Sequence, residues 1–138
     1  MAADPPCLCS TLRRATRALT ATYDAALRPA GLRVTQFSIL RMLERLGPMP
    51  VTRLATEAVL DRSTMGRNLD PLERRGFVRL TVNAADQRER VASLTEAGRD
   101  ALVAAVPLWR EAQARIEAAL PSTVVADITG RLATLDRP

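Results

Sequence analysis

Apolar positions in the first part of the chain recur every three or four residues, which is the period of a helix with one buried face. The first stripe predicts a helix that starts near Cys7 and stops before the breaker Arg-Pro-Ala-Gly at 28–31. A second stripe predicts a helix that Thr35 caps and that ends at 47–48. The members of the two stripes are Leu8, Leu12, Ala15, Leu19, Tyr23 and Ala26, then Phe37, Leu40, Leu43 and Leu46.

Two shorter helices on either side of a tight turn come next. Residues 49–51 predict a short edge strand, and Thr52 is the expected cap of a helix that stops before the turn at 59–61. Asp61 caps the following helix, because its carboxylate can accept from free backbone N–H groups, and Gly76 ends that helix. The inward positions are Leu54, Ala55 and Ala58 in the first helix and Met65, Leu69 and Leu72 in the second.

The apolar period then changes from that of a helix to that of a strand. Residues 77–82 alternate, with Val78, Leu80 and Val82 on one face. Residues 83–86 form a turn, and 88–94 can be the returning strand. The sequence therefore predicts a two-stranded hairpin, which must lean on the helices because a lone hairpin is only marginally stable.

Long helical stripes return after the hairpin. A helix from Thr95 is expected to bend at Pro107, and Pro121 separates it from a last helix. The stripes at 8–26 and 101–135 are longer than a small hairpin-bearing domain needs, which indicates a two-fold dimer that buries the same patch of both copies. The alternative is that they cover only the core of a monomer. The apolar members of these two helices are Ala101, Leu102, Ala105, Leu108, Trp109, Ala112 and Ile116, then Val124, Val125, Ile128, Leu132 and Leu135.

Helix, tight turn, helix and two-stranded wing, in this order, make a winged helix-turn-helix. The predicted fold class is mostly α with a small antiparallel β-wing, in which a winged helix-turn-helix core is flanked by N- and C-terminal dimerisation helices. Residues 1–138 form one domain, with the winged lobe at 33–95 and the helical dimerisation lobe at 7–28 and 96–135.

The amino-acid composition excludes several classes of enzyme. The net charge is +5, all 20 basic residues are arginine, and the chain has neither lysine nor histidine. Imidazole acid–base catalysis, a Ser-His-Asp triad and lysine Schiff-base chemistry are thereby excluded, so we expect no enzyme and no cofactor. The positive excess lies before residue 91 and favours a polyanionic partner, to which arginine binds well through bidentate contacts.

The helix after Asp61 has the features of a DNA-reading helix. Ser63 and Arg67 lie opposite its apolar face, with Thr64 and Gly66 beside them. Gly66 weakens the helix, either because the backbone approaches DNA there or because of tight packing or neutral drift. At the wing tip, Arg88 can enter a minor groove with Asp86 orienting it, or the pair can form only a local salt bridge.

The stretches LDRSTMGRNLDPLERRGFVRL (60–80) and DQRERVASLTEAGR (86–99) resemble the multiple-antibiotic-resistance regulator (MarR) family. GLRVTQFSILRML at 31–43 is similar to the second helix of that family, and the resemblance extends from about residue 8 to residue 135. Pro71 departs from the commonest family pattern: it removes a backbone bond inside the recognition helix and puts a straight helix in doubt.

The resemblance implies a homodimeric bacterial transcription regulator, usually a repressor, that binds a palindromic double-stranded DNA operator. The family's minor-groove arginine falls on Arg88 and its acidic partner on Asp86, and the major-groove contacts fall on 62–67. The expected DNA-binding residues are Arg62, Ser63, Thr64, Gly66, Arg67, Asp86, Arg88 and Arg90.

Two kinds of signal are candidates for the control of DNA binding. Some branches of this family sense oxidants through a cysteine near the start of the first helix. Cys7 or Cys9 fits that role, since a helix N-terminus and a nearby arginine favour a thiolate, and a disulfide is then expected between subunits. The alternative is that both thiols are idle. No metal is expected, because two thiols do not complete a tetrahedral site.

The second kind of signal is a small aromatic or anionic effector, which many members of the family bind between the dimer helices and the DNA-binding lobe. The expected pocket residues are Arg17, Tyr23, Phe37, Arg41 and Trp109. The alternative for each aromatic is ordinary core packing.

A winged-helix module that binds protein and not DNA is the competing function. The start of the chain lacks the apolar region of a signal peptide and no stretch suits a membrane span, so a cytoplasmic protein is expected.

Overall fold

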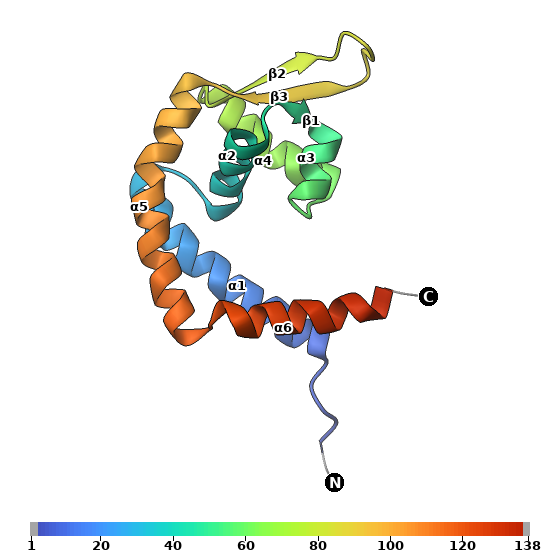
Figure 1. Ribbon diagram of the computed structural model, residues 1–138, viewed down its shortest axis with the longest axis vertical. Coiled ribbons are helices and arrows are strands. Elements are labelled where there is room, and N and C mark those ends of the chain that lie inside the picture. Colours follow the sequence, from blue (N-terminus) through green and yellow to red (C-terminus); the bar gives the residue numbers. More distant parts are fainter. Residues whose placement is uncertain (1–2, 137–138) are drawn as a thin grey trace.

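The computed structural model describes residues 3–136, and within them six α-helices and three short strands follow the predicted order (Figure 1). A long first helix leads into a lobe of short elements, and two more helices complete the chain. The helices are α1 (Leu8–Leu27), α2 (Val34–Leu46), α3 (Val51–Glu57), α4 (Arg62–Arg74), α5 (Glu96–Ala119) and α6 (Ser122–Ala133). The strands are β1 (Met49–Pro50), β2 (Val78–Val82) and β3 (Arg90–Leu94), and single 3₁₀ turns occur at Arg28–Ala30 and Thr134–Asp136.

The three strands form one antiparallel sheet in the order β1-β3-β2. Ala92 of β3 is the centre of this sheet, because it lies opposite both Met49 and Leu80. β1 is the expected edge strand. The wing is therefore tied at its base to the segment that precedes α3, and this contact gives the hairpin the support that it needs.

One apolar core joins the sheet to the helices of the lobe. The predicted inward positions of α4 are all buried, and so are most of those of α2 and α3. The core also takes in residues that the helical spacing did not select, such as Leu27, Ile39 and Met49. Its most deeply buried large side chains are Leu27, Phe37, Ile39, Leu40, Met49, Leu54, Met65, Leu69 and Leu72.

Two predicted helix starts are wrong by a few residues, and a side chain that was expected to point inward is exposed. α2 begins at Val34, because Asp24 of α1 accepts a hydrogen bond from the Val34 N–H at 2.8 Å, so Thr35 is not its cap. α3 begins directly after Pro50, so Thr52 lies inside it. Leu46, a predicted inward position at the end of α2, is 49% exposed. Val82, which shares a strand face with the buried Val78, is 62% exposed at the start of the wing loop.

The returning strand is also shorter than predicted. It begins at Arg90, because Arg88 lies in the turn. At the base of the wing, Thr95 joins the sheet to α5. Its hydroxyl donates to the Gly76 carbonyl at 2.6 Å and accepts from the Gly98 N–H at 3.0 Å. A Cβ at Gly98 would overlap the Phe77 carbonyl oxygen, so only glycine allows this close contact.

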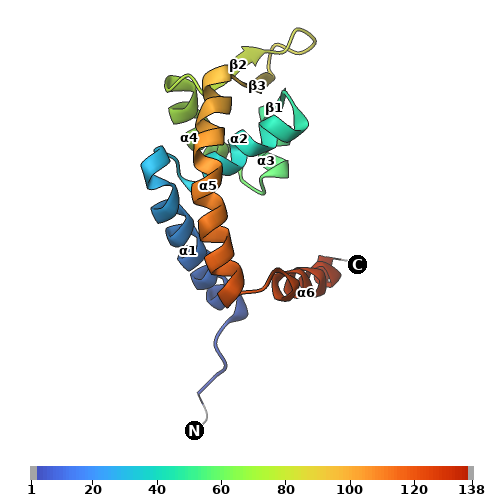
Figure 2. The ribbon, with the colours of Figure 1, turned by 60° about the vertical axis from the view of Figure 1, so that its left-hand side comes forward.

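Helices α1 and α5 pack side by side and hold the lobe at one end, while α6 projects away from both (Figures 1 and 2). α5 continues through Pro107 and is curved, as the proline predicts. No residue of α6 is buried. Among the helices of residues 3–136, none combines the length and the apolar character that a bilayer crossing requires.

Candidate nucleic-acid interface

The predicted reading helix begins with a cluster of hydrogen bonds on Asp61. One carboxylate oxygen accepts from the Thr64 N–H at 2.7 Å and from the Ser63 hydroxyl at 2.9 Å. The other oxygen accepts from the Thr64 hydroxyl at 2.9 Å. The Thr64 N–H is the first cause of a lowered pKa of Asp61, and the two hydroxyls add to it. The carboxylate thus fixes both hydroxyl side chains of the predicted reading set.

Arg67 completes this end of α4. It is exposed, and its guanidinium donates to the Thr64 hydroxyl at 3.3 Å. Arg62 is exposed one residue after the cap. Gly66 has no atom within 4 Å of the place where a Cβ would lie. Tight packing within the described chain therefore does not explain this glycine, which leaves approach to a partner or drift.

Pro71 lies inside α4, in its last turns, and the helix runs unbroken from Arg62 to Arg74. The α4 residues expected to contact DNA precede it by at least one turn. The structure thus accommodates the proline after the reading end of the helix.

The wing tip is shaped by side chains that bind backbone groups. Asp86 accepts from the Arg88 backbone N–H at 3.0 Å, and Asn83 accepts from the Ala85 N–H at 3.0 Å. Among residues 3–136, no ion pair joins the side chains of Asp86 and Arg88. Asp86 therefore folds the turn that presents Arg88, whose side chain is exposed.

Arg90 differs from the other predicted contacts. Its guanidinium lies 4.0 Å from the carboxylate of Glu73, near the end of α4. Both side chains are about half exposed, so this ion pair adds little stability. It does link the base of the wing to the reading helix.

This arrangement matches known regulators. A sequence model of the MarR family matches residues 32–89. The transcriptional regulator MosR of Mycobacterium tuberculosis, solved in complex with DNA, is 41% identical, covers 96% of this chain and all of its own, and has a TM-score of 0.83. The chain belongs to the MarR family. Its members among these relatives are transcription regulators and not enzymes, as the lack of histidine and lysine predicts.

Two further relatives of this chain are also transcription regulators. The repressor CouR, solved on a 23-mer DNA duplex, is 28% identical with a TM-score of 0.78, over 95% of this chain and 93% of its own. CouR of Rhodococcus jostii has also been solved with p-coumaroyl-CoA, at 28% identity and a TM-score of 0.73 over 93% and 90%. The regulator HosA of Escherichia coli is 33% identical over 73 residues, which is 53% of this chain and about half, 54%, of HosA.

The two cysteines lie at the start of α1, both exposed. Cys7 is the N-cap position, and the pKa of its thiol is lowered, first by the Ser10 backbone N–H and then by the Cys9 N–H and the Ser10 hydroxyl. Arg13 lies one turn further on, and its guanidinium contacts the Cys9 sulfur at 3.7 Å. The helix N-terminus thus favours a thiolate at Cys7, whereas the arginine contacts Cys9.

The predicted effector residues divide into two places. Phe37 stacks on Trp109 with ring centroids 5.6 Å apart, and the Arg41 guanidinium lies 4.4 Å from the Trp109 ring centroid. Phe37 is 1% exposed, so it packs in the core. These three residues join α2 to α5.

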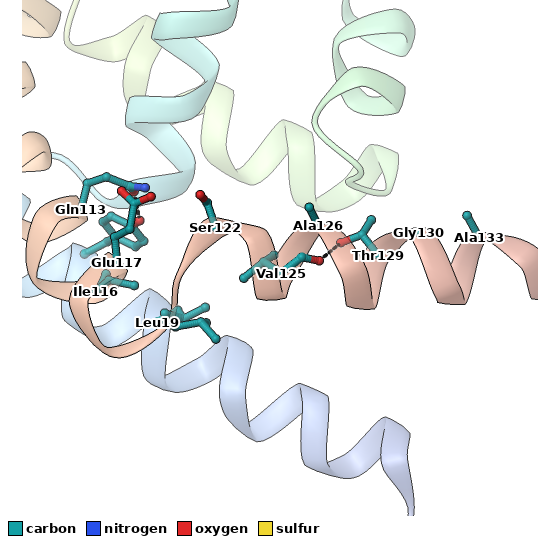
Figure 3. Close-up of a pocket in the computed structure, with 12 residues that line it drawn as sticks. Leu19, Gln113, Ile116, Glu117, Ser122, Val125, Ala126, Thr129, Gly130 and Ala133 are labelled. Carbon is teal, nitrogen blue, oxygen red and sulfur yellow. Dashed lines mark hydrogen bonds between the residues drawn. The ribbon is translucent and has the colours of Figure 1, made fainter.

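Tyr23 belongs instead to a cavity of about 650 Å³ at the elbow between α5 and α6 (Figure 3). Its hydroxyl donates to the Gln113 amide oxygen. Burial raises the pKa of Tyr23, and the Glu117 carboxylate raises it further. Arg17, one to two turns before Tyr23 on α1, is exposed and does not line this cavity.

Sequence reasoning missed two residues near the interface. Val59, in the turn before α4, has a φ of 55° and is 89% exposed, a strained conformation for a β-branched residue. Asn68 donates to the Thr64 carbonyl at 2.8 Å and so supports the reading end of the helix. An exposed valine in a loop gives no signal of backbone strain in the sequence.

Proposed function

We propose that the chain is a homodimeric transcription repressor that reads a palindromic operator, with α4 in the major groove and the wing in the minor groove. The observation that carries this proposal is the reading end of α4. There Ser63, Thr64 and Arg67 share one hydrogen-bonded cluster around Asp61 and remain at the surface. Residues at the N-terminal end of such a helix are those that reach base edges. MosR, with 41% identity over its whole length, was solved on DNA.

The dimer is supported by an apolar surface that the single chain leaves uncovered. α6 has no buried residue, and its apolar side chains are about 40% exposed: Val124, Val125, Ile128 and Leu132. Leu8 and Leu12 of α1 are exposed as well. A second copy that brings the same helices would bury these side chains around a two-fold axis, and two winged lobes would then match a palindrome.

We further propose that DNA release follows a chemical signal, either oxidation at Cys7 or Cys9 or binding of a small molecule. The lowered pKa of Cys7 supports the oxidant signal, because the thiolate is the reactive form. The structural relative CouR has been solved with p-coumaroyl-CoA, which supports a small-molecule signal. A ligand must favour the state that does not bind DNA in order to act.

The first test is binding of the full chain to the DNA just upstream of its own gene. Fluorescence anisotropy would be recorded over a series of salt concentrations, under reducing conditions and again after peroxide. The proposal expects tight binding that weakens with salt by a log–log slope of about −0.9 per neutralised phosphate. Loss of binding after peroxide supports the cysteine signal. Tight binding that ignores peroxide directs the search to small molecules.

Absence of binding to that DNA would move the test to selection from random duplexes. Failure there as well would overturn the proposal and favour a winged-helix module that binds protein. Sedimentation equilibrium tests the dimer separately, since a monomer at micromolar concentration would contradict it.

A further inference from the structure

A second hollow is lined by none of the residues that are proposed to bind DNA or an effector. It has a volume of about 560 Å³ and opens where the end of α1, the α1–α2 connection and the C-terminal end of α4 meet. Three arginines from these three segments line it: Arg28, Arg33 and Arg75. Its one lining carboxylate is Asp24. The site is therefore strongly positive.

The other polar groups of the hollow are already engaged. Asp24 accepts from the Val34 N–H at 2.8 Å, and Gln36 accepts from the Arg33 N–H at 3.1 Å. The backbone N–H groups of Arg33 and Val34 are thus satisfied. None of the three lining arginines takes part in an ion pair within residues 3–136. The guanidinium groups of the three arginines are therefore charged donors that can serve a ligand.

Arg75 is held in place for such a role. It donates to the Gly31 carbonyl at 2.5 Å, and its guanidinium lies 4.5 Å from the Phe77 ring centroid. Gly31 has a φ of 68°, and a Cβ there would lie 2.9 Å from an Arg75 nitrogen. An arginine has five N–H donors, so one carbonyl leaves most of the fork free. Because the group is pre-positioned, binding an anion to it costs little additional ordering.

We propose that this arginine-lined hollow binds a small anion of the phosphate class that carries at least two negative charges. Guanidinium groups match phosphate oxygens in bidentate pairs. The three positive guanidinium groups exceed the one engaged carboxylate in charge, and the excess can neutralise a dianion. Arg28 and Arg33 on one side and Arg75 on the other would close on it, so the anion would connect the α1–α2 connection to the end of α4.

The same chemistry exists in the DNA backbone, but the position favours a free anion. Arg75 follows Ser63 by twelve residues, which is about 18 Å along a helix at about 1.5 Å per residue. In Figure 1 the α1–α2 connection lies on the α5 side of the lobe, and the wing tip and α3 lie on the opposite side. The hollow is thus at the far end of α4 from the reading residues.

The test is calorimetric titration of the full chain with inorganic phosphate and with pyrophosphate, in chloride buffer of constant ionic strength. The main variant is Arg28→Gln with Arg33→Gln, since neither guanidinium makes a hydrogen bond that the fold requires. Arg75→Gln is the second variant. Arg45→Gln is the matched control, because Arg45 is exposed on α2 and does not line the hollow. Circular dichroism checks that each variant is folded.

Two results together would support the site. The wild-type chain and Arg45→Gln should bind pyrophosphate saturably, and the affinity of the double variant should be lower by about tenfold or more, as expected for the loss of charged hydrogen bonds. No saturable binding by the wild-type chain, or equal binding by the double variant, would overturn it. A parallel DNA titration without added phosphate distinguishes a free anion from the phosphate groups of the DNA backbone. Unchanged DNA affinity in the double variant supports a free anion, whereas a loss as large as that for pyrophosphate would assign the arginines to the DNA backbone and overturn the proposal.

Discussion

Asp61 holds Thr64 by both of its carboxylate oxygens, one on the backbone N–H at 2.7 Å and one on the hydroxyl at 2.9 Å. The same residue thus caps α4 and orients a side chain that is expected to read DNA. Stability and recognition are therefore coupled at this position.

Replacing Asp61 by alanine should destabilise the protein, because the N-cap bond is lost. Asp61→Asn is the matched control, since it keeps an accepting oxygen without the charge. Folding lowers the pKa of Asp61 below its ordinary value of 3.8. The ionic part of its contribution is therefore present above that pH and disappears as the pH falls through the folded-state pKa. Urea unfolding of the three proteins at neutral and acidic pH measures this. A stability gap between wild type and Asp61→Asn that persists at the lowest pH would contradict it.

Val59→Gly should stabilise the fold by about 1 kcal/mol, since it relieves a left-handed backbone conformation, and the side chain is 89% exposed and loses little burial. Val82→Gly is the control. Val82 is also exposed but lies in a strand, where glycine should cost roughly 0.5–1 kcal/mol. Thermal or urea unfolding reports both changes. Equal destabilisation by the two substitutions would show that Val59 carries no strain.

Gly66→Ala should raise the stability of the fold by up to about 1 kcal/mol, because alanine is the better helix former and its Cβ meets no atom within 4 Å. The same change should weaken DNA binding if the backbone approaches the duplex at this point, as we expect. Unfolding and anisotropy measurements on one preparation separate the effects. Unchanged DNA affinity would leave drift as the explanation for the glycine.

Arg88→Ala should weaken operator binding several-fold and reduce the salt slope by about one, as expected for one lost contact to the DNA. The fold should persist, because the Arg88 backbone N–H, and not its side chain, completes the wing turn with Asp86. Arg45→Ala removes the same charge from the C-terminal part of α2 and serves as the control. An affinity equal to that of wild type would remove Arg88 from the interface.

Cys7→Ser combined with Cys9→Ser should abolish any effect of peroxide on DNA binding. In the single variant Cys9→Ser, the alkylation rate of Cys7 should rise with pH about a midpoint below the ordinary thiol pKa of 9.0, since the Ser10 N–H stabilises the thiolate. Iodoacetamide labelling followed by mass spectrometry measures the rate. A double variant that still responds to peroxide would exclude a thiol switch.

The order of the elements and the family could both be predicted from local patterns in the sequence. Met65, Leu69 and Leu72 recur at a helical period, and all three are buried, because a helix on a core must turn one stripe inward. Asp61 and Gly76 marked both ends of α4, since capping and left-handed termini depend on local chemistry. The hairpin was visible for the same reason, because its alternation is a local pattern.

Features that depend on contacts between distant segments could not be predicted in this way. α2 starts at Val34 because Asp24, ten residues earlier, supplies the acceptor, and no local pattern shows that pairing. Five residues were expected to line one effector pocket, but in the folded chain Phe37 packs in the core and Tyr23 lies at the α5–α6 elbow. Arg75 meets Gly31 across 44 positions of the chain. Spacing along a sequence defines one face of one element, whereas a site built from three elements exists only once they have packed together.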